Sequence, residues 1–293
     1  LPAVREFIGP FAESEEIGRL ITLTAADTSR PTALRAALLE ILASRPANRE
    51  DADVVAAFRS ALHSIDPDLI RTALRAAPVQ HLPRLEDDLT RIAHSQYDLA
   101  LRLDAARALV RFRPALTEQT LSLLESALAM TNSPALRLAA AEILSTAALS
   151  TTQLERFIQS ASRDRIISPS LVVSAAQRAI SPAPEPLLDY LLNALDSGWQ
   201  LPEATLAWLD KGFPKHSKLE RLRATARQTI EDRLAKLASY EPLLEGGDPN
   251  AGHQLFLGKL ACATCHRVGK HGGLVGPDLT RIGAIRSGRD LIE

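Results

Sequence analysis

Apolar residues recur along the first two thirds of the chain at the spacing of one helical face. In the segment 31–42, Leu38, Leu39 and Leu42 lie three, four and seven positions after Arg35. Residues at that spacing line one side of an α-helix. Similar segments recur at 67–77, 98–109, 134–144 and 169–179. Second periodic segments lie between them, for example at 82–93 and 116–128. We therefore predict successive pairs of antiparallel helices.

These segments repeat at a nearly constant period. When they are aligned on Arg35, Arg71, Arg102, Arg137 and Val172, the steps are 36, 31, 35 and 35 residues. A helix pair of about 35 residues can bury its apolar face only against the adjacent helix pairs. Such an arrangement is an α-solenoid. The period and the loose pattern P-x-x-x-R-x-x-A/L resemble HEAT-type repeats. The resemblance covers roughly residues 25–180 and implies an all-α fold, a HEAT-type α-solenoid of helix pairs.

One arginine recurs in most of the repeats, and two interpretations of it are open. The arginines could form a ladder that binds a ligand, or they could pack between adjacent helix pairs as structural elements. We favour the structural interpretation, because long arginine side chains commonly cover apolar surface between helices.

Glycine placement marks a boundary near Glu245. Ten of the 14 glycines fall between Gly246 and Gly288, and none falls between Arg19 and Ser197. Before the boundary, the repeats end at the sequence SPAPEP (181–186). Shorter helical patterns follow, and the pattern at 217–240 predicts one long helix. The apolar face of that helix carries Leu219, Leu222, Ala226, Ile230, Leu234 and Leu237. The predicted domains are an N-terminal lead-in (1–24), helical repeats (25–180), a helical cap and linker helix (181–245) and a second domain (246–293).

Composition excludes several classes of protein. Hydrophobic residues make up 46% of the chain and charged residues 24%, as in ordinary globular proteins. The formal net charge of −1 argues against a dedicated nucleic-acid binder. Apolar runs are too short to cross a bilayer, so we expect no membrane span in this chain. Because the sequence starts at Leu1 without a signal-like segment, we expect a processed protein or a piece of a longer one.

Both cysteines lie in the segment CATCH, at Cys262 and Cys265, directly before His266. The spacing C-x-x-C-H is that of c-type haem attachment. Two thiols about one helical turn apart can reach the two vinyl groups of one haem as thioethers, while the adjacent histidine ligates the iron. We therefore favour covalent haem c as the cofactor and His266 as the metal ligand.

Three other interpretations of the two cysteines remain open. A zinc site would need four nitrogen or sulfur ligands, and beyond this motif only His271 and His253 are near in sequence. A thioredoxin-like redox pair would need a β-α-β context, of which the sequence gives no sign. Two chemically inert thiols are the third interpretation.

The segment 246–293 resembles a class I cytochrome c domain, and more narrowly the planctomycete-type haem-binding domains that follow HEAT-like regions. Gly252 and Phe256 match the first cytochrome helix, and GPDL at 276–279 matches the G-P-x-L segment after the attachment motif. The resemblance implies that the Pro277 carbonyl accepts the Nδ1 proton of the proximal histidine and that Leu279 packs on the porphyrin. The implied cofactor-binding residues are thus Cys262, Cys265, His266, Pro277 and Leu279.

The same segment departs from the family in one respect. Class I cytochromes place a methionine downstream on the far side of the haem, yet no methionine follows His266, and Met130 lies among the repeats, where we expect a core residue. Only 27 residues follow His266, so we expect the haem domain to be incomplete. His253 and His271 are candidate sixth ligands, with a plain loop histidine as the alternative.

The leading hypothesis for function is a c-type haem electron-transfer module on a HEAT-like scaffold. The resemblance implies a redox partner protein or a fused dehydrogenase domain, hence part of a larger oxidoreductase, and an exported or periplasmic location. No catalytic constellation is visible in the chain itself. The alternative is a protein-interaction solenoid, with a partner on its concave face and a tail that is not redox-active. A haem enzyme such as a peroxidase is a third hypothesis.

Overall fold

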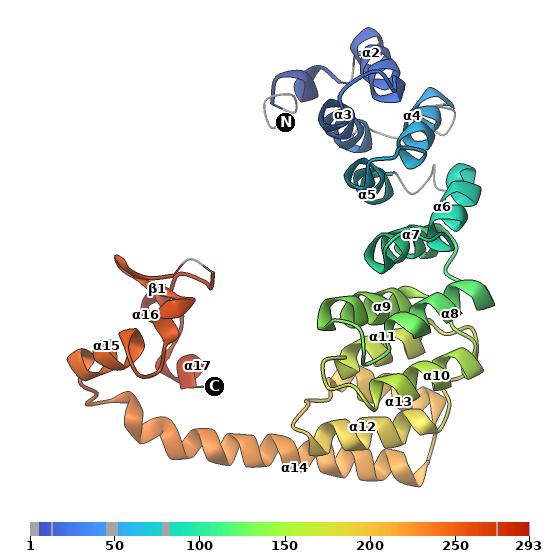
Figure 1. Cartoon of the computed structure of the whole chain (residues 1–293). Coiled ribbons are helices and arrows are strands. Elements are labelled where there is room, and N and C mark those ends of the chain that lie inside the picture. Colours follow the sequence, from blue (N-terminus) through green and yellow to red (C-terminus); the bar gives the residue numbers. More distant parts are fainter. Residues whose placement is uncertain (1–5, 13, 45–51, 78–82, 274, 293) are drawn as a thin grey trace. The chain divides into compact units, whose positions relative to one another are not determined.

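The computed structural model describes residues 6–12, 14–44, 52–77, 83–273 and 275–292, and these residues are mostly helical (Figure 1). The predicted all-α class is confirmed at this level. The first helices are α2 (Glu15–Ala26), α3 (Thr32–Ser44), α4 (Ala52–Leu62), α5 (Pro67–Ala76), α6 (Glu86–Ala93), α7 (Leu99–Phe112), α8 (Glu118–Ala127), α9 (Pro134–Thr146), α10 (Thr151–Ala161) and α11 (Pro169–Arg178). After them come α12 (Pro186–Asp196), α13 (Glu203–Gly212), α14 (Ser217–Tyr240), α15 (Pro249–Leu257), α16 (Ile282–Ile285) and α17 (Gly288–Ile292). Short 3₁₀ helices lie at η1 (Gly9–Phe11), η3 (Glu241–Leu244) and η4 (Cys262–Thr264), and two short strands at β1 (Arg267–Val268) and β2 (His271–Gly272).

The chain forms two compact units. One contains Leu1–Ala194 and Ala207–Pro214, and the other contains Leu195–Leu206 and Lys215–Glu293. Helix α14 and the segment after Glu245 therefore belong to the same unit.

Helices in the first unit contact each other in two rows. One row runs through α3, α5, α7, α9 and α11, each contacting the next, and the other row includes the contacts α2 to α4, α4 to α6 and α8 to α10 (Figure 1). All five anchored segments are helices within a few residues of their predicted bounds, and so are the second segments, although Leu82 lies outside the described residues. Helix α2 lies largely within the predicted lead-in and packs with α3 and α4.

Local sequence explains where these helices begin. Helices α5, α9 and α11 start at a proline, whose fixed φ suits the first helical position and whose missing N–H costs nothing there. Ser150 begins α10 with a capping box, since its side chain accepts from the Gln153 backbone N–H and the Gln153 side chain accepts from the Ser150 N–H. Asp98 and Thr117 cap α7 and α8 in a similar way.

The predicted apolar faces form the core of the first unit. Leu38, Leu39 and Leu42 are buried, as are the small residues Ala105 and Ala106 at the equivalent positions of α7. Small residues let neighbouring helices approach closely, while leucines fill the remaining space.

Two of the recurring arginines cap the end of a preceding helix. Arg35 Nε donates to the Ala25 carbonyl at 2.9 Å, and Arg102 Nε donates to the Ala93 carbonyl at 3.0 Å. The last carbonyls of a helix have no partner within that helix, so the guanidinium groups satisfy them. These two contacts agree with the structural interpretation of the arginines.

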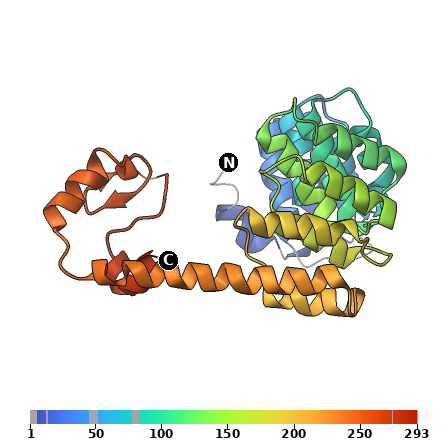
Figure 2. The same ribbon diagram turned by 90° about the horizontal axis from the view of Figure 1, so that it is seen from below.

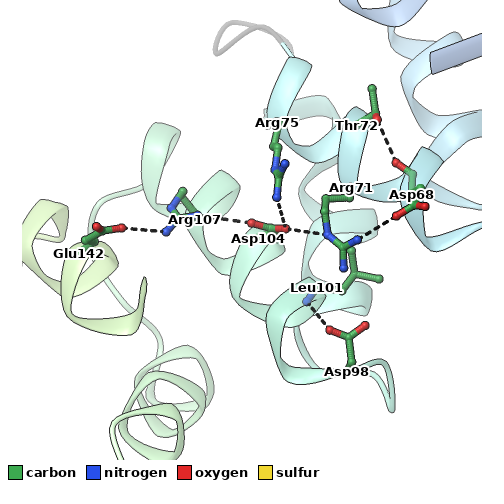
Figure 3. Close-up of polar contacts among 9 residues, drawn as sticks. All are labelled: Asp68, Arg71, Thr72, Arg75, Asp98, Leu101, Asp104, Arg107 and Glu142. Carbon is green, nitrogen blue, oxygen red and sulfur yellow. Dashed lines mark hydrogen bonds and ion pairs between the residues drawn. The ribbon is translucent and has the colours of Figure 1, made fainter. Parts of the chain in front are cut away.

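Arg71 belongs instead to a network of charged groups that links three helices of one row (Figure 3). Asp104 on α7 lies 3.4 Å from Arg71 Nε, 3.5 Å from Arg75 Nη2 and 3.4 Å from Arg107 Nη1. Arg107 continues to Glu142 on α9 at 3.2 Å. The network links α5, α7 and α9 through charged side chains.

Arg137, the next arginine of the series, forms a buried ion pair. Its Nη1 lies 2.9 Å from Asp164 Oδ2, and the two side chains are 9% and 4% exposed. Neither Arg137 Nε nor Asp164 Oδ2 has a hydrogen-bond partner among the described residues, so charge rather than an aligned hydrogen bond holds the pair. Met130, expected in the core, is 61% exposed, and its sulfur accepts from Arg137 Nη1. The core expectation for Met130 was therefore wrong, because Met130 lies in the turn after α8.

The second unit is organised along α14, which is seen along its length in both ribbon views (Figures 1 and 2). The helix has the bounds predicted for it. On its apolar face Leu219, Leu222, Ala226 and Leu237 are buried, whereas Ile230 and Leu234 are about half exposed. At its C-terminal end, α17 contacts α14 and η3. Within the described residues, none of the helices combines the length and apolar character that crossing a bilayer requires.

The buried pair yields a test of the packing between α9 and the loop after α10. We expect Asp164→Ala to lower the free energy of unfolding by about 3 kcal/mol, because it leaves the buried Arg137 guanidinium without a counter-charge. Replacing both residues, with Arg137→Met and Asp164→Leu, should restore most of this loss. Urea unfolding followed by circular dichroism measures both. Glu142→Gln, which removes an exposed charge, is the control and should cost less than about 1 kcal/mol; an equal cost for Asp164→Ala would contradict the prediction.

Candidate functional site

The CATCH segment forms a tight turn after α15. Asp248 begins α15 by accepting from the Asn250 and Ala251 backbone N–H groups at 2.8 and 3.2 Å. After the helix ends, Ala261 takes a left-handed conformation with φ of 53°, and the chain turns into η4. The Cys262 carbonyl then accepts from the N–H groups of Cys265 and His266 at 3.2 and 3.0 Å. One helical turn thus carries both cysteines and the histidine.

A second stretch of backbone is laid against this turn. Strands β1 and β2 pair as a small antiparallel hairpin, and the chain then runs past the turn a second time. Three backbone hydrogen bonds join the two stretches: Gly273 N–H to the Ala263 carbonyl at 2.7 Å, Gly276 N–H to the Cys265 carbonyl at 2.7 Å, and Leu279 N–H to the Arg267 carbonyl at 2.8 Å. The predicted site residues are therefore brought together by backbone pairing.

Glycine is required where the two stretches touch. A Cβ at Gly272, whose φ is +110°, would lie 2.0 Å from the His266 carbonyl oxygen, and one at Gly273 would lie 2.3 Å from that of Thr264. A Cβ at Gly276 would lie 2.8 Å from both Nδ1 and Cε1 of the His266 ring. Only hydrogen fits at these positions, so the backbone itself lies against the imidazole.

His266 is oriented by the carbonyl of Pro277. The His266 Nδ1 atom lies 3.0 Å from the Pro277 oxygen. A carbonyl oxygen only accepts hydrogen bonds, so Nδ1 must carry the proton and donate it. In a neutral imidazole the lone pair is then on Nε2, the atom left to bind a metal. The contact that the cytochrome resemblance implies between these two residues is present in the structure.

The two cysteines are free thiols at the surface of this turn. Cys262 is half-buried and Cys265 is exposed. The contact of Cys262 is a weak one, from Sγ to the Leu260 carbonyl oxygen at 3.7 Å. Neither cysteine residue is buried, and neither is in a disulfide.

Asp278 holds the second stretch to the first through its side chain. Its Oδ2 accepts from Arg267 Nε and Nη2 at 3.1 and 2.8 Å, and its Oδ1 accepts from the Thr280 N–H at 2.8 Å and from the Thr280 hydroxyl. The Thr280 hydroxyl oxygen in turn accepts from the Gly269 N–H at 2.8 Å. Hydrogen bonds from Thr280, followed by those from Arg267, lower the pKa of the Asp278 carboxyl to about 2.

Several large apolar side chains around the site are exposed, whereas those of Phe256 and Leu279 are partly buried. None of the described residues after Leu237 is buried. The exposed fractions run from 37% for Val268 to 87% for Val275. Leu255, Leu257, Leu260, Ile285 and Leu291 lie between these values. This part of the chain has a framework of hydrogen bonds without an apolar core.

The side chains of the other predicted residues take no part in the hydrogen bonds described above. His253 and His271 contact each other edge to face, with ring centroids 5.7 Å apart. Phe256 and Leu279 are half-buried, and open space lies beside Gly252. Within the described ranges, no group of three or more histidine, cysteine or acidic side chains is arranged to hold a metal ion.

Sequence reasoning missed Arg267 as a member of this site. Asp278 lies in the GPDL segment that matches the cytochrome pattern, and nothing in the sequence pairs Asp278 or Thr280 with the arginine after the motif. The signal available in the sequence was the position of Arg267. It directly follows His266, so the two residues lie on the same stretch of backbone. Comparisons with protein-family models, curated proteins and solved structures find no match to this chain.

Gly276→Ala tests the approach of backbone to imidazole. The added Cβ would overlap the His266 ring, so we expect the ring to move and the Nδ1 to lose its bond to the Pro277 carbonyl. Histidine-selective ¹⁵N NMR of the full chain reports this as loss of the Nδ1–H tautomer. Gly283→Ala is the matched control, because a Cβ there meets nothing within 4 Å. Retention of the tautomer in Gly276→Ala would contradict the prediction.

The depressed pKa of Asp278 predicts acid sensitivity. A carboxyl with a folded-state pKa of about 2, against roughly 3.9 in an unfolded chain, contributes stability that is present above about pH 4 and lost as the pH falls towards 2. NMR titration of the Thr280 amide should show a midpoint near 2. Thr280→Val should raise the pKa of Asp278, since the Thr280 hydroxyl is the largest cause of the shift. A midpoint near 4 in the unaltered protein would disprove the assignment.

Proposed function

We propose that this chain is a c-type haem-binding electron-transfer module carried on a HEAT-like helical scaffold. The observation that carries the proposal is one turn with two free cysteines next to an imidazole whose Nδ1 is held by the Pro277 carbonyl. Two thiols at this spacing suit the two vinyl groups of haem, and Nε2 suits the iron.

The chemistry of the surrounding surface fits such a group. Haem is a large, flat, mostly apolar molecule, and several apolar side chains after Leu237 are exposed, among them Leu255, Leu260 and Val275. A 48-residue segment of this kind rarely forms a stable core without a cofactor, a metal or a partner surface. Bound haem would cover part of that surface.

Each residue of the site has a defined task in this proposal. The thiols of Cys262 and Cys265 add across the vinyl groups, so that each sulfur forms a carbon–sulfur bond and each thiol proton moves to vinyl carbon. His266 ligates the iron through Nε2, and Pro277 fixes the ring orientation and raises its basicity. Leu279 packs on the porphyrin, as the cytochrome resemblance implies. Iron in the bound group supplies one-electron chemistry, while the chain supplies attachment, orientation and burial.

The first unit would serve as a HEAT-type solenoid scaffold. Its support is the period near 35 residues together with the contacts that run from each helix to the next through α3, α5, α7, α9 and α11. No catalytic residues are assigned here, so we place substrate oxidation in a redox partner or a fused dehydrogenase domain of a larger oxidoreductase. Thioether attachment occurs outside the cytoplasmic membrane, so the proposal implies an exported or periplasmic protein.

One observation favours a second candidate, a protein-interaction scaffold. Between α10 and α12 lies an open groove of about 560 Å³ with polar and aromatic side chains along it. The residues from these helices include Glu155, Arg156, Gln159, Asp189, Tyr190 and Asn193. Such a groove could hold an extended peptide from a partner.

Visible spectroscopy tests the proposed function. Chain produced with the c-type maturation machinery should show a sharp α band on reduction and should keep its haem after acid–acetone extraction. The double variant Cys262→Ser with Cys265→Ser should lose haem on extraction, and His266→Ala should lose the low-spin spectrum of a histidine-ligated iron. His253→Ala is the matched control for a histidine change in the same segment and should keep its covalent haem. Extraction of haem from the unaltered chain would overturn the proposal and favour the interaction scaffold.

A further inference from the structure

Asp278 directly follows the peptide group that contains the Pro277 carbonyl. The peptide bond between these residues is planar, so the Pro277 carbonyl and the Asp278 N and Cα atoms lie in a single plane. The pyrrolidine ring restricts rotation on the other side of Pro277. Whatever holds Asp278 therefore sets the direction in which the Pro277 oxygen points.

The carboxylate of Asp278 is exposed, yet several hydrogen bonds hold it in place. Arg267 presents two N–H groups to one oxygen, and Thr280 presents its N–H and its hydroxyl to the other. Both partners of the ion pair are about 40% exposed, so the pair contributes little to overall stability. The geometry of a two-pronged guanidinium contact fixes position more than it adds free energy.

The contacts of Asp278 with Arg267 and Thr280, which we call the clamp, also lie next to His266 along the chain. Arg267 follows His266 directly, and Asp278 follows Pro277 directly, so the two contacts are adjacent ties between the same two stretches. The bond from the Leu279 N–H to the Arg267 carbonyl adds a third tie beside them. Without the contact between Arg267 and Asp278, only the backbone bonds of Gly276 and Leu279 would restrain the chain on either side of the Pro277 carbonyl.

We propose that Asp278 is a positioning residue for His266: clamped by Arg267 and Thr280, it holds the Pro277 carbonyl at the imidazole Nδ1. The inference rests on the proposed function only where it concerns the bound iron. The orientation of the imidazole is a property of the chain itself, and the clamp is complete without haem. When iron is bound, a firm Nδ1 bond makes the imidazole a stronger donor and favours the oxidised metal.

The first test uses the haem-free full-length chain. Histidine-selective ¹⁵N NMR at neutral pH should show His266 mostly as the Nδ1–H tautomer. Asp278→Ala should shift it to the Nε2–H form that histidine prefers in water, and Arg267→Lys, which keeps the charge and loses the fork, should cause a partial shift. Asp290→Ala is the matched control, because Asp290 is an exposed carboxylate of the same segment that is hydrogen-bonded to Ser287. An unchanged His266 tautomer in both Asp278→Ala and Arg267→Lys would overturn the proposal.

The second test uses haem-loaded chain. Asp278→Ala should raise the midpoint potential relative to the unaltered protein, because a weaker Nδ1 bond stabilises oxidised iron less, whereas Asp290→Ala should leave the potential unchanged. Equal potentials for the two variants would overturn the role at the iron. If the unaltered chain takes up no haem but its tautomer depends on Asp278, the proposed function fails and the positioning role stands. If haem attaches but the His266 tautomer does not depend on Asp278, the positioning role fails and the proposed function stands.

Discussion

The helices of the first unit are too short and too one-sided to be stable alone, and they bury their apolar faces against neighbouring helices of both rows. Isolated helices of 8–14 residues are marginal in water, so packing supplies most of their stability. The small residues that repeat along α7 and α9 permit that packing, and the arginines that reach back to the end of a previous helix close it. Local sequence sets where these helices begin, whereas their packing and their charged contacts depend on the neighbouring helices.

The segment after α14 is built on the opposite principle. It buries none of its described residues, and a set of hydrogen bonds gives it shape. Three backbone bonds, the His266 to Pro277 bond and the Asp278 clamp hold two stretches of chain together at distances of 2.7–3.1 Å. Such bonds contribute only about 1 kcal/mol each in water. A framework of this kind is suited to hold a few side chains in place for an apolar group that supplies the missing burial.

Much of this organisation was predictable from particular residues. The apolar spacing after Arg35 and its equivalents predicted the helices to within a few residues, and Ser217–Tyr240 was predicted with its observed bounds. The spacing of Cys262, Cys265 and His266 identified the candidate site. Met130 was misjudged because a methionine between two apolar helices reads as core, whereas it lies in the exposed turn that separates them.

The sequence by itself determined which segments are helical and which three side chains share one turn, because helical period and a five-residue motif are local properties. The tertiary structure alone decided which of the recurring arginines cap a helix, pair with Asp104 or are buried with Asp164, since the partners lie 9 to 33 residues away along the chain. It also decided that Arg267 and Asp278 meet beside the imidazole. Contacts of that kind depend on how the chain returns past itself, and three glycines without room for a Cβ set that return path.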